Sequence, residues 1–157
     1  KFYPEPTLEL ATWFHDVVYD THSRENESRS AQFALESLRS LGIRESRCQR
    51  VHDLILMTVK HDAPEGDTDA WLFLDADLSV LGRSQDEYAR YAQAIRMEYA
   101  WVEEEVYLRA RKQVLVQFLD RPNIYRSGHA REFNEIMARL NLIEEIGQID
   151  DKLRTLA

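Results

Sequence analysis

Apolar residues recur every three or four positions along most of the chain, which is the spacing of helices that bury one face. This pattern predicts helices over residues 7–19, 27–41, 45–61, 70–81 and 129–153, and nearly unbroken helix over 84–119 with a bend near Trp101. Polar residues, Pro and Gly predict loops at 20–27, 62–68 and 121–123. No segment shows the clear period-2 alternation of a β-strand. The chain is therefore predicted to be all-α, with six or seven helices.

The ends and faces of several helices follow from particular residues. Gly42 stands in a C-terminal capping position after the helix at 27–41, and Gly82 ends the helix at 70–81. The third helix is predicted to turn its apolar side inward at Val51, Leu54, Ile55, Thr58 and Val59. The last helix is predicted to be amphipathic, with apolar positions at Phe133, Ile136, Met137, Leu140, Ile143 and Ile146.

The length and net charge of the chain indicate how many domains it forms and which partners it binds. The 157 residues suffice for one domain with a hydrophobic core, so a single domain over 1–157 is predicted. The net charge of −8, from 20 basic and 28 acidic residues, argues against general nucleic-acid binding. A small phosphorylated substrate remains compatible with this charge, because a bound cation supplies local positive charge.

Cysteine content and hydropathy indicate the compartment. Cys48 is the only cysteine, which excludes an internal disulfide framework and a Cys-rich zinc site. No stretch approaches the ~20 apolar residues of a membrane span, and no signal peptide is recognisable. A reducing cytoplasm, with no membrane attachment, is therefore the expected environment.

Two motifs place titratable side chains in apolar surroundings. His15-Asp16 ends an apolar run, and neighbouring side chains near a helix end can both lean toward one ion. An imidazole and a carboxylate together suit a divalent cation. Asp75 and Asp77 lie in an otherwise apolar helix, where burial is costly unless a carboxylate is paired or binds a cation. Helix capping or pairing with Arg is the alternative for these two acids.

Other candidates remain open beside these motifs. His52-Asp53 is a second His-Asp pair and competes with the first. His61 is predicted to close the third helix, where contact with a metal or phosphate competes with a favourable interaction with the helix dipole. Asp75 and Asp77 are two residues apart and face different ways, so at most one is expected to touch an ion.

The residues around these motifs resemble the sequence pattern of metal-dependent HD-superfamily phosphohydrolases. The resemblance begins in His15-Asp16-Val17-Val18-Tyr19-Asp20, Glu25-Asn26-Glu27 and Ser30-Ala31. It continues in residues 73–82, Ile95-Arg96, Glu98-Tyr99, Ile124-Tyr125, Phe133, Ala138-Arg139 and Asn141-Leu142. It spans nearly the whole chain, and its spacing favours His15-Asp16 over His52-Asp53 as the HD pair.

The resemblance implies an HD-domain-like helical bundle that holds a divalent cation of the group Mn, Mg, Co, Ni, Fe and Zn. It assigns His15, Asp16 and Asp77 as metal ligands, with Asp75 in reserve for Asp77 and His61 as the ligand of a second ion. The implied reaction is hydrolysis of a small phosphate ester or nucleotide by metal-activated water. Asp16 would orient or deprotonate that water.

Further roles are implied less directly. Asp20 and Glu27 are candidates for positioning water, with ordinary loop and helix N-terminal roles as the alternative. Arginine can clamp a phosphate through two donors, and the candidates are Arg96, Arg111 and Arg139; pairing with acids is the alternative.

The run from His15 to Thr21 is also similar to the hydrolase domain of stringent-response alarmone enzymes. Those enzymes carry Glu where this chain has Tyr19, and the residues after Asp77 differ from theirs, so their specificity does not carry over. Two alternatives to the phosphohydrolase remain: a nucleotide or alarmone pyrophosphohydrolase, and a non-catalytic helical binding module with a degenerate HD site.

The HD pattern also contains a His upstream of the His-Asp pair, and residues 1–14 contain none. The resemblance therefore implies a further N-terminal segment of roughly 20–40 residues that carries this His on a helix. In its absence the surface near Trp13 and Phe14 is expected to be exposed and to favour a homo-oligomer.

Overall fold

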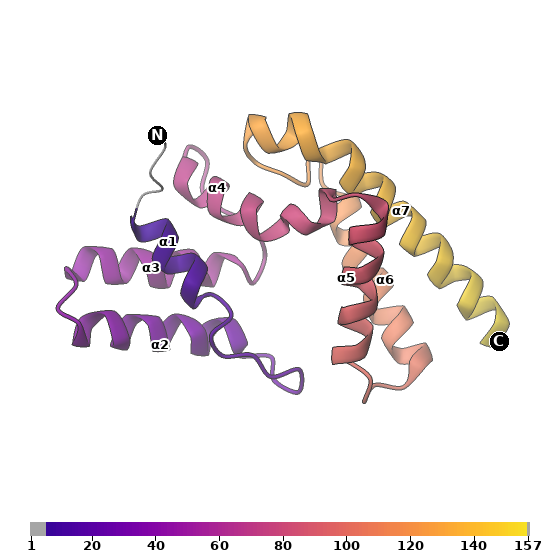
Figure 1. Cartoon of the computed structure of the whole chain (residues 1–157), viewed down its shortest axis with the longest axis horizontal. Helices are drawn as coiled ribbons and strands as arrows, with labels where there is room; N and C mark the ends of the chain where they lie inside the picture. Colours follow the sequence, from indigo (N-terminus) through magenta and orange to yellow (C-terminus); the bar gives the residue numbers. More distant parts are fainter. Residues whose placement is uncertain (1–5, 157) are drawn as a thin grey trace. The chain divides into compact units, whose positions relative to one another are not determined.

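A computed structural model describes residues 6–156 of the chain (Figure 1). Over this range the structure is entirely helical, with seven α-helices, one 3-10 helix and no strand. The elements are α1 (Pro6–Phe14), α2 (Asn26–Ser40), α3 (Glu45–Met57), α4 (Thr68–Asp77), η1 (Leu78–Gly82), α5 (Gln85–Glu98), α6 (Glu104–Leu119) and α7 (Gly128–Leu156). The predicted all-α class and the predicted number of helices are thus confirmed.

The chain divides into two compact units, residues 1–74 and 75–157, and the division falls within α4. Each unit has a hydrophobic core of its own. The single domain over 1–157 stays a prediction, and its outermost boundaries lie outside the described residues. None of the described helices combines the length and the apolar composition that a membrane span requires.

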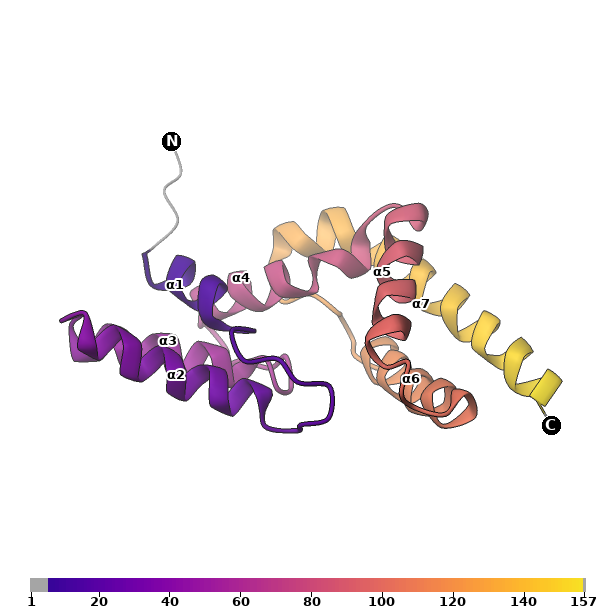
Figure 2. The same cartoon turned by 60° about the horizontal axis from the view of Figure 1, so that its bottom comes forward.

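In the first unit, α1 and α2 pack against α3, and α2 and α3 run antiparallel side by side (Figures 1 and 2). The short connection between α2 and α3 favours this antiparallel arrangement. Residues at helical spacing meet in the core: Ala11, Ala31, Ala34, Leu35, Leu38, Cys48, Val51, Leu54, Ile55, Ala70, Phe73 and Leu74. The predicted inward side of the third helix is confirmed except at Val59, which is exposed.

The end of α2 confirms the role predicted for Gly42. Gly42 has a φ of +74°, a conformation that glycine adopts without the steric cost of a side chain. Its N–H donates to Arg39 O, and the N–H of Ile43 donates to Leu38 O. These two hydrogen bonds form a Schellman motif, which satisfies carbonyl groups that the helix itself leaves open.

Two predicted helices end earlier in the structure than their apolar pattern suggests. The helix predicted over 7–19 ends at Phe14, and the helix predicted over 45–61 ends at Met57. The chain then turns, and His61 has a φ of +47°, which a helix does not allow. The candidate residues His15, Asp16 and His61 therefore lie in turns that follow the helices, not on the helices.

In the second unit, η1 and α6 pack against α7, and α5 packs against η1. The core consists of Leu78, Leu81, Tyr88, Tyr107, Leu108, Leu115, Ile124, Tyr125, Ala130, Ala138, Leu142 and Ile149. Residues 99–103 separate α5 from α6, so the helix predicted over 84–119 is two helices. A break replaces the predicted bend near Trp101.

The predicted apolar face of the last helix is not the face that packs. Of its six predicted positions only Ile146 packs against the core, and the other five are exposed. The buried side instead carries Ala130, Ala138, Leu142 and Ile149. Helix α7 has apolar residues on two sides, and the periodicity of its larger side chains selected the wrong one.

Candidate functional site

His15 and Asp16 lie next to each other in the turn that follows α1. The His15 N–H donates to Ala11 O at 2.9 Å, which continues the helical hydrogen bonding by one residue. The His15 Nδ1 lies 2.8 Å from Thr12 O, and its Nε2 lies 3.4 Å from Asp16 Oδ2. The rings of His15 and Phe73 are nearly perpendicular, at a centroid distance of 6.1 Å. The resemblance to HD enzymes thus falls on two side chains that do face each other.

The segment after the pair is held to the start of α2 by side-chain hydrogen bonds. Buried Ser30 accepts the N–H of Val18 at 3.0 Å and donates to Val18 O at 3.2 Å. Asn26 makes the corresponding pair of hydrogen bonds with the backbone of Asp20, at 3.0 and 2.9 Å. Asn26 and Ser30, which belong to the same motif, therefore hold the backbone of the residues that follow His15-Asp16.

Two acids predicted to position water lie along this segment. The Asp20 carboxylate accepts the N–H of His22 at 2.9 Å, which is a local turn hydrogen bond. Glu27 is partly buried in the first turn of α2, where a negative charge interacts favourably with the helix dipole. Both positions agree with the structural alternatives left open by the sequence, and their catalytic roles stay predictions.

The competing pair His52-Asp53 lies on α3. His52 Nδ1 is 3.0 Å from Asp53 Oδ1, and Gln49 Nε2 donates to the same oxygen at 2.8 Å. His61 is partly buried in the turn after α3, and its N–H donates to Thr58 O at 3.3 Å. The pair His52-Asp53 is thus hydrogen-bonded to Gln49 within α3.

Asp75 and Asp77 occupy different environments. Asp75 is 5% exposed, and its two oxygens accept the N–H groups of Arg126 and Ser127, each at 2.7 Å. This carboxylate holds the loop that leads into α7. Asp77 is the last residue of α4 and is partly buried. Asp75 thus serves as a backbone acceptor in the structure, and metal binding by Asp77 stays a prediction.

The three candidate phosphate clamps are hydrogen-bonded within the second unit. Arg96 donates to Tyr99 O and Val102 O, which holds the break between α5 and α6. Arg111 forms two hydrogen bonds with Glu145, at 2.8 and 3.1 Å. The remaining candidate, Arg139, binds Glu135, one carbonyl group at the end of α6 and two carbonyl groups of the loop that follows. Their contact with phosphate stays a prediction, and each guanidinium has a structural partner.

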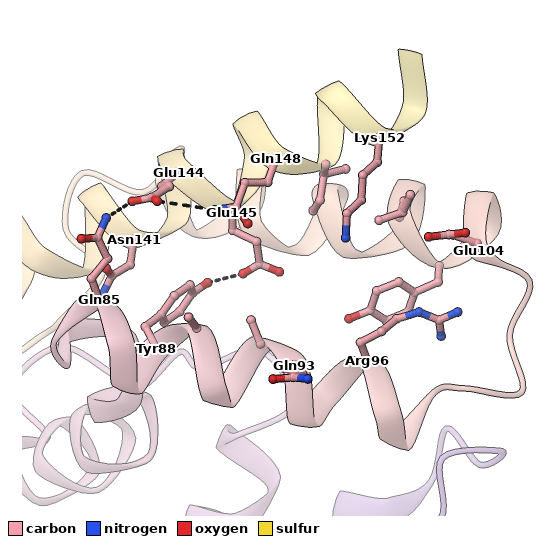
Figure 3. Close-up of a pocket in the computed structure, with 15 residues that line it drawn as sticks. Gln85, Tyr88, Gln93, Arg96, Glu104, Asn141, Glu144, Glu145, Gln148 and Lys152 are labelled. Atoms are coloured by element: carbon pink, nitrogen blue, oxygen red, sulfur yellow. Dashed lines mark hydrogen bonds between the residues drawn. The ribbon is translucent and has the colours of Figure 1, made fainter. Parts of the chain in front are cut away.

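A pocket of about 280 Å³ lies between α5, α6 and α7 of the second unit (Figure 3). At one end Gln85 donates to Glu144, and Arg96, Glu104 and Lys152 line the other end. Its floor is apolar and includes Leu108, Ala89, Ala92 and Ile149. Arg96 is the one residue of the sequence-predicted site that lines this pocket.

Several interacting residues of the second unit were not identified from the sequence. Tyr88 donates to Glu145 at 2.5 Å beside the Arg111 pair. Burial, followed by this hydrogen bond, raises the pKa of the Tyr88 hydroxyl. Glu135 accepts the N–H groups of Ile124 and Tyr125 in addition to binding Arg139. Arg111 and Glu145 are 34 residues apart, and no local pattern in the sequence relates positions at that distance.

Metal coordination requires several donors at one point. Among residues 6–156, no group of three or more His, Cys, Asp and Glu side chains is arranged to hold an ion. His15 and Asp16 supply an imidazole nitrogen and a carboxylate oxygen side by side. These two donors are fewer than a group of three, and a divalent cation of the group Mn, Mg, Co, Ni, Fe and Zn stays a prediction.

The chain matches no family model, no curated protein and no solved structure. The functional assignment therefore depends on the residues and their geometry.

Proposed function

We propose that this protein is a metal-dependent phosphohydrolase in which His15 and Asp16 bind the ion and the substrate is a small phosphate ester or nucleotide. The observation that carries the proposal is the orientation of the His15 ring. A backbone carbonyl can only accept a hydrogen bond, so His15 Nδ1 carries the proton in its contact with Thr12 O at 2.8 Å. A neutral imidazole then has its lone pair on Nε2.

The lone pair on Nε2 is directed toward a carboxylate oxygen 3.4 Å away. Two electron-rich atoms at this distance attract a proton or a cation between them. A divalent cation would be held here by His15 Nε2 and Asp16 Oδ2, an imidazole nitrogen and a carboxylate oxygen. Metal-binding histidines commonly donate their other ring N–H to a backbone carbonyl, as His15 does to Thr12.

The chain's own residues would bind and orient in this proposal. Thr12 fixes the tautomer and the plane of the His15 ring, and Asp16 supplies a second oxygen that can accept a proton from water. Asp77 is the third ligand that the resemblance assigns. A bound divalent cation would lower the pKa of a coordinated water and neutralise charge on phosphoryl oxygens.

The test compares the two His-Asp pairs of the chain. Manganese affinity is measured by calorimetry for the wild type, His15→Ala and Asp16→Asn, with His52→Ala as the matched control. We expect the first two variants to bind manganese more than about tenfold more weakly and the control to bind as the wild type does. Equal affinity in all four proteins would contradict the proposed ion site.

Turnover is measured on the same proteins with 4-nitrophenyl phosphate and a nucleoside diphosphate. Manganese-dependent hydrolysis that is lost in His15→Ala and kept in His52→Ala supports the phosphohydrolase. Preference for the diphosphate would instead favour the pyrophosphohydrolase.

A non-catalytic helical binding module remains the second candidate. It is favoured by the structural hydrogen bonds that occupy Arg96, Arg111 and Arg139, because these were the candidate phosphate clamps. Manganese binding at His15 without hydrolysis of either substrate would favour this candidate over the enzyme.

A further inference from the structure

Three arginines line one cavity at the start of α3, in the first unit. The cavity has a volume of about 280 Å³, and its polar lining includes Arg44, Arg47, Arg50, Ser46 and Asp69. The arginines are three residues apart, so they follow one side of the first two helical turns. In a chain with a net charge of −8, this is a local concentration of positive charge.

The charges in this cavity are only partly compensated. Arg50 donates to Asp67 at 2.5 Å, and this hydrogen bond lowers the pKa of the Asp67 carboxyl. Arg44 and Arg47 make no side-chain hydrogen bond or ion pair within residues 6–156. Asp69 lines the cavity without forming an ion pair with either of them. Two guanidinium groups therefore remain to bind an anion.

Backbone groups add to the attraction. Arg44 precedes α3 and forms no side-chain cap on it. The first N–H groups of a helix carry partial positive charge and point out of its N-terminal end. Ser46, whose hydroxyl can donate a hydrogen bond, also lines the cavity. The cavity thus brings Arg44, Arg47 and Ser46 together at the N-terminal end of α3.

We propose that this cavity is a binding site for a phosphate group, either inorganic phosphate or the phosphate of a small ester. Arg44 and Arg47 are the groups expected to bind the phosphate, because guanidinium groups bind phosphate oxygens through paired donors. Together they carry one positive charge more than the Asp69 carboxylate in the same lining offsets. The site is separate from the pair His15-Asp16. Thr7 lines the cavity, and His15 follows it by eight positions, which corresponds to roughly 12 Å along a helix.

This site goes beyond the phosphohydrolase proposal and does not depend on a metal. Binding is therefore measured in the presence of EDTA, at constant ionic strength, with inorganic phosphate and glycerol phosphate as probes. We expect saturable binding of at least one probe by calorimetry, with changes in the amide resonances of Ser46 and Arg47. Absence of saturable binding by both probes would overturn the proposal.

Charge-matched variants separate this site from general electrostatic attraction. Arg44→Gln/Arg47→Gln is expected to bind at least about tenfold more weakly than the wild type. The control, Arg24→Gln/Arg29→Gln, removes the same charge from exposed positions of the same unit and is expected to bind as the wild type does. Equal losses in the two double variants, with helicity unchanged, would show that the cavity is not the site.

A single substitution distinguishes guanidinium geometry from charge. Arg47→Lys keeps the positive charge and removes the paired donors, so we expect an affinity between those of the wild type and the double glutamine variant. His15→Ala is expected to bind phosphate as the wild type does. Loss of phosphate binding in His15→Ala would place the anion at the His-Asp pair and overturn the separate site.

Discussion

Glu145 on α7 accepts two hydrogen bonds from Arg111 on α6, at 2.8 and 3.1 Å, and both side chains are nearly buried, at 12% and 10% exposure. Burial alone would lower the pKa of Arg111, but the hydrogen bonds to Glu145 and the charge of Glu145 outweigh it and raise this pKa. Tyr88 on α5 donates to the same carboxylate. The Glu145 carboxylate therefore connects α5, α6 and α7 through hydrogen bonds.

Removal of Glu145 is predicted to destabilise this unit strongly. Glu145→Leu leaves the Arg111 charge buried without its partner, and we expect a loss of about 3–5 kcal/mol in the free energy of unfolding, measured with urea. The double variant Arg111→Met/Glu145→Leu is expected to lose less than the sum of the single variants. Additive losses would show that the pair is not energetically coupled.

The exposed pair Arg109–Glu105 on α6 is the matched control for this prediction. Arg109 also donates two hydrogen bonds to its carboxylate, but its side chain is 64% exposed and that of Glu105 is 45% exposed. Solvent screens an ion pair of this kind. Glu105→Leu is therefore expected to change the free energy of unfolding by less than about 1 kcal/mol.

Stability is predicted to fall in alkaline solution because of Tyr88. Burial, and next the hydrogen bond to Glu145, raise the pKa of Tyr88 in the folded state above its ordinary value near 10. A raised pKa means that the folded state keeps a proton that the unfolded chain releases. Its contribution is therefore complete below pH 10 and is lost as the pH rises further.

Urea denaturation between about pH 8 and pH 11, a range that includes the ordinary tyrosine pKa, checks this expectation. Tyr88→Phe should give a shallower fall in the free energy of unfolding than the wild type. Tyr91→Phe removes the neighbouring hydroxyl without touching Glu145 and should keep the wild-type slope. Burial also raises the pKa of Tyr107 and of Tyr125, so a smaller slope should remain in Tyr88→Phe.

Two glycines of the second unit are predicted to respond oppositely to alanine. A Cβ on Gly82 would lie 2.6 Å from Asn134 Cβ, whereas a Cβ on Gly147 would meet nothing within 4 Å. Gly82→Ala is expected to lower the free energy of unfolding by about 1–3 kcal/mol through overpacking. Gly147→Ala, within α7, is expected to raise it by about 0.5–1 kcal/mol. Thermal denaturation of both variants measures the two signs, and a stabilising Gly82→Ala would refute the close approach.

The same glycines show what the sequence could reveal about the fold. Gly42 and Gly82 were identified as helix ends because local chemistry decides where a helix stops. Gly42 is confirmed, whereas the α-helix predicted over 70–81 ends at Asp77 and Gly82 is the last residue of the 3-10 helix η1 that follows. The close approach at Gly82 was not predictable, because Asn134 lies far away in sequence. The packed face of α7 was missed for a related reason: small Ala138 lies in the core while large Ile136 is exposed, and only the tertiary structure reveals this.

The candidate site was predictable to a similar extent. The resemblance selected His15-Asp16, and these side chains face each other at 3.4 Å. The sequence could not show that α1 ends before them, because Val17 and Val18 continue its apolar spacing. It also gave no sign of the arginine cavity, because charged residues three apart are common on exposed helix faces.

Substitutions of Asp75 and of Asp77 are predicted to have different effects: the first mainly on stability, the second mainly on metal binding. Asp75 accepts two backbone N–H groups at 2.7 Å, and Asp75→Ala leaves both without that acceptor. We expect this variant to lose about 2–4 kcal/mol in the free energy of unfolding, because each buried unpaired group is costly. Asp77 is partly buried at the end of α4, and Asp77→Asn, which keeps the shape of the side chain, is expected to lower the free energy of unfolding less than Asp75→Ala does.

If Asp77 is the third ligand of the proposed ion site, substitution of Asp77 should reduce metal affinity more than substitution of Asp75 does. Asp77→Asn should then bind manganese more weakly than the wild type. Asp75→Asn, which keeps one acceptor oxygen, should bind manganese unchanged under conditions in which circular dichroism shows it to be folded. If folded Asp75→Asn bound manganese more weakly and Asp77→Asn bound it as the wild type does, Asp75 would replace Asp77 as the third ligand. This result would also require a carboxylate that already accepts two backbone hydrogen bonds to give up at least one of them to the ion.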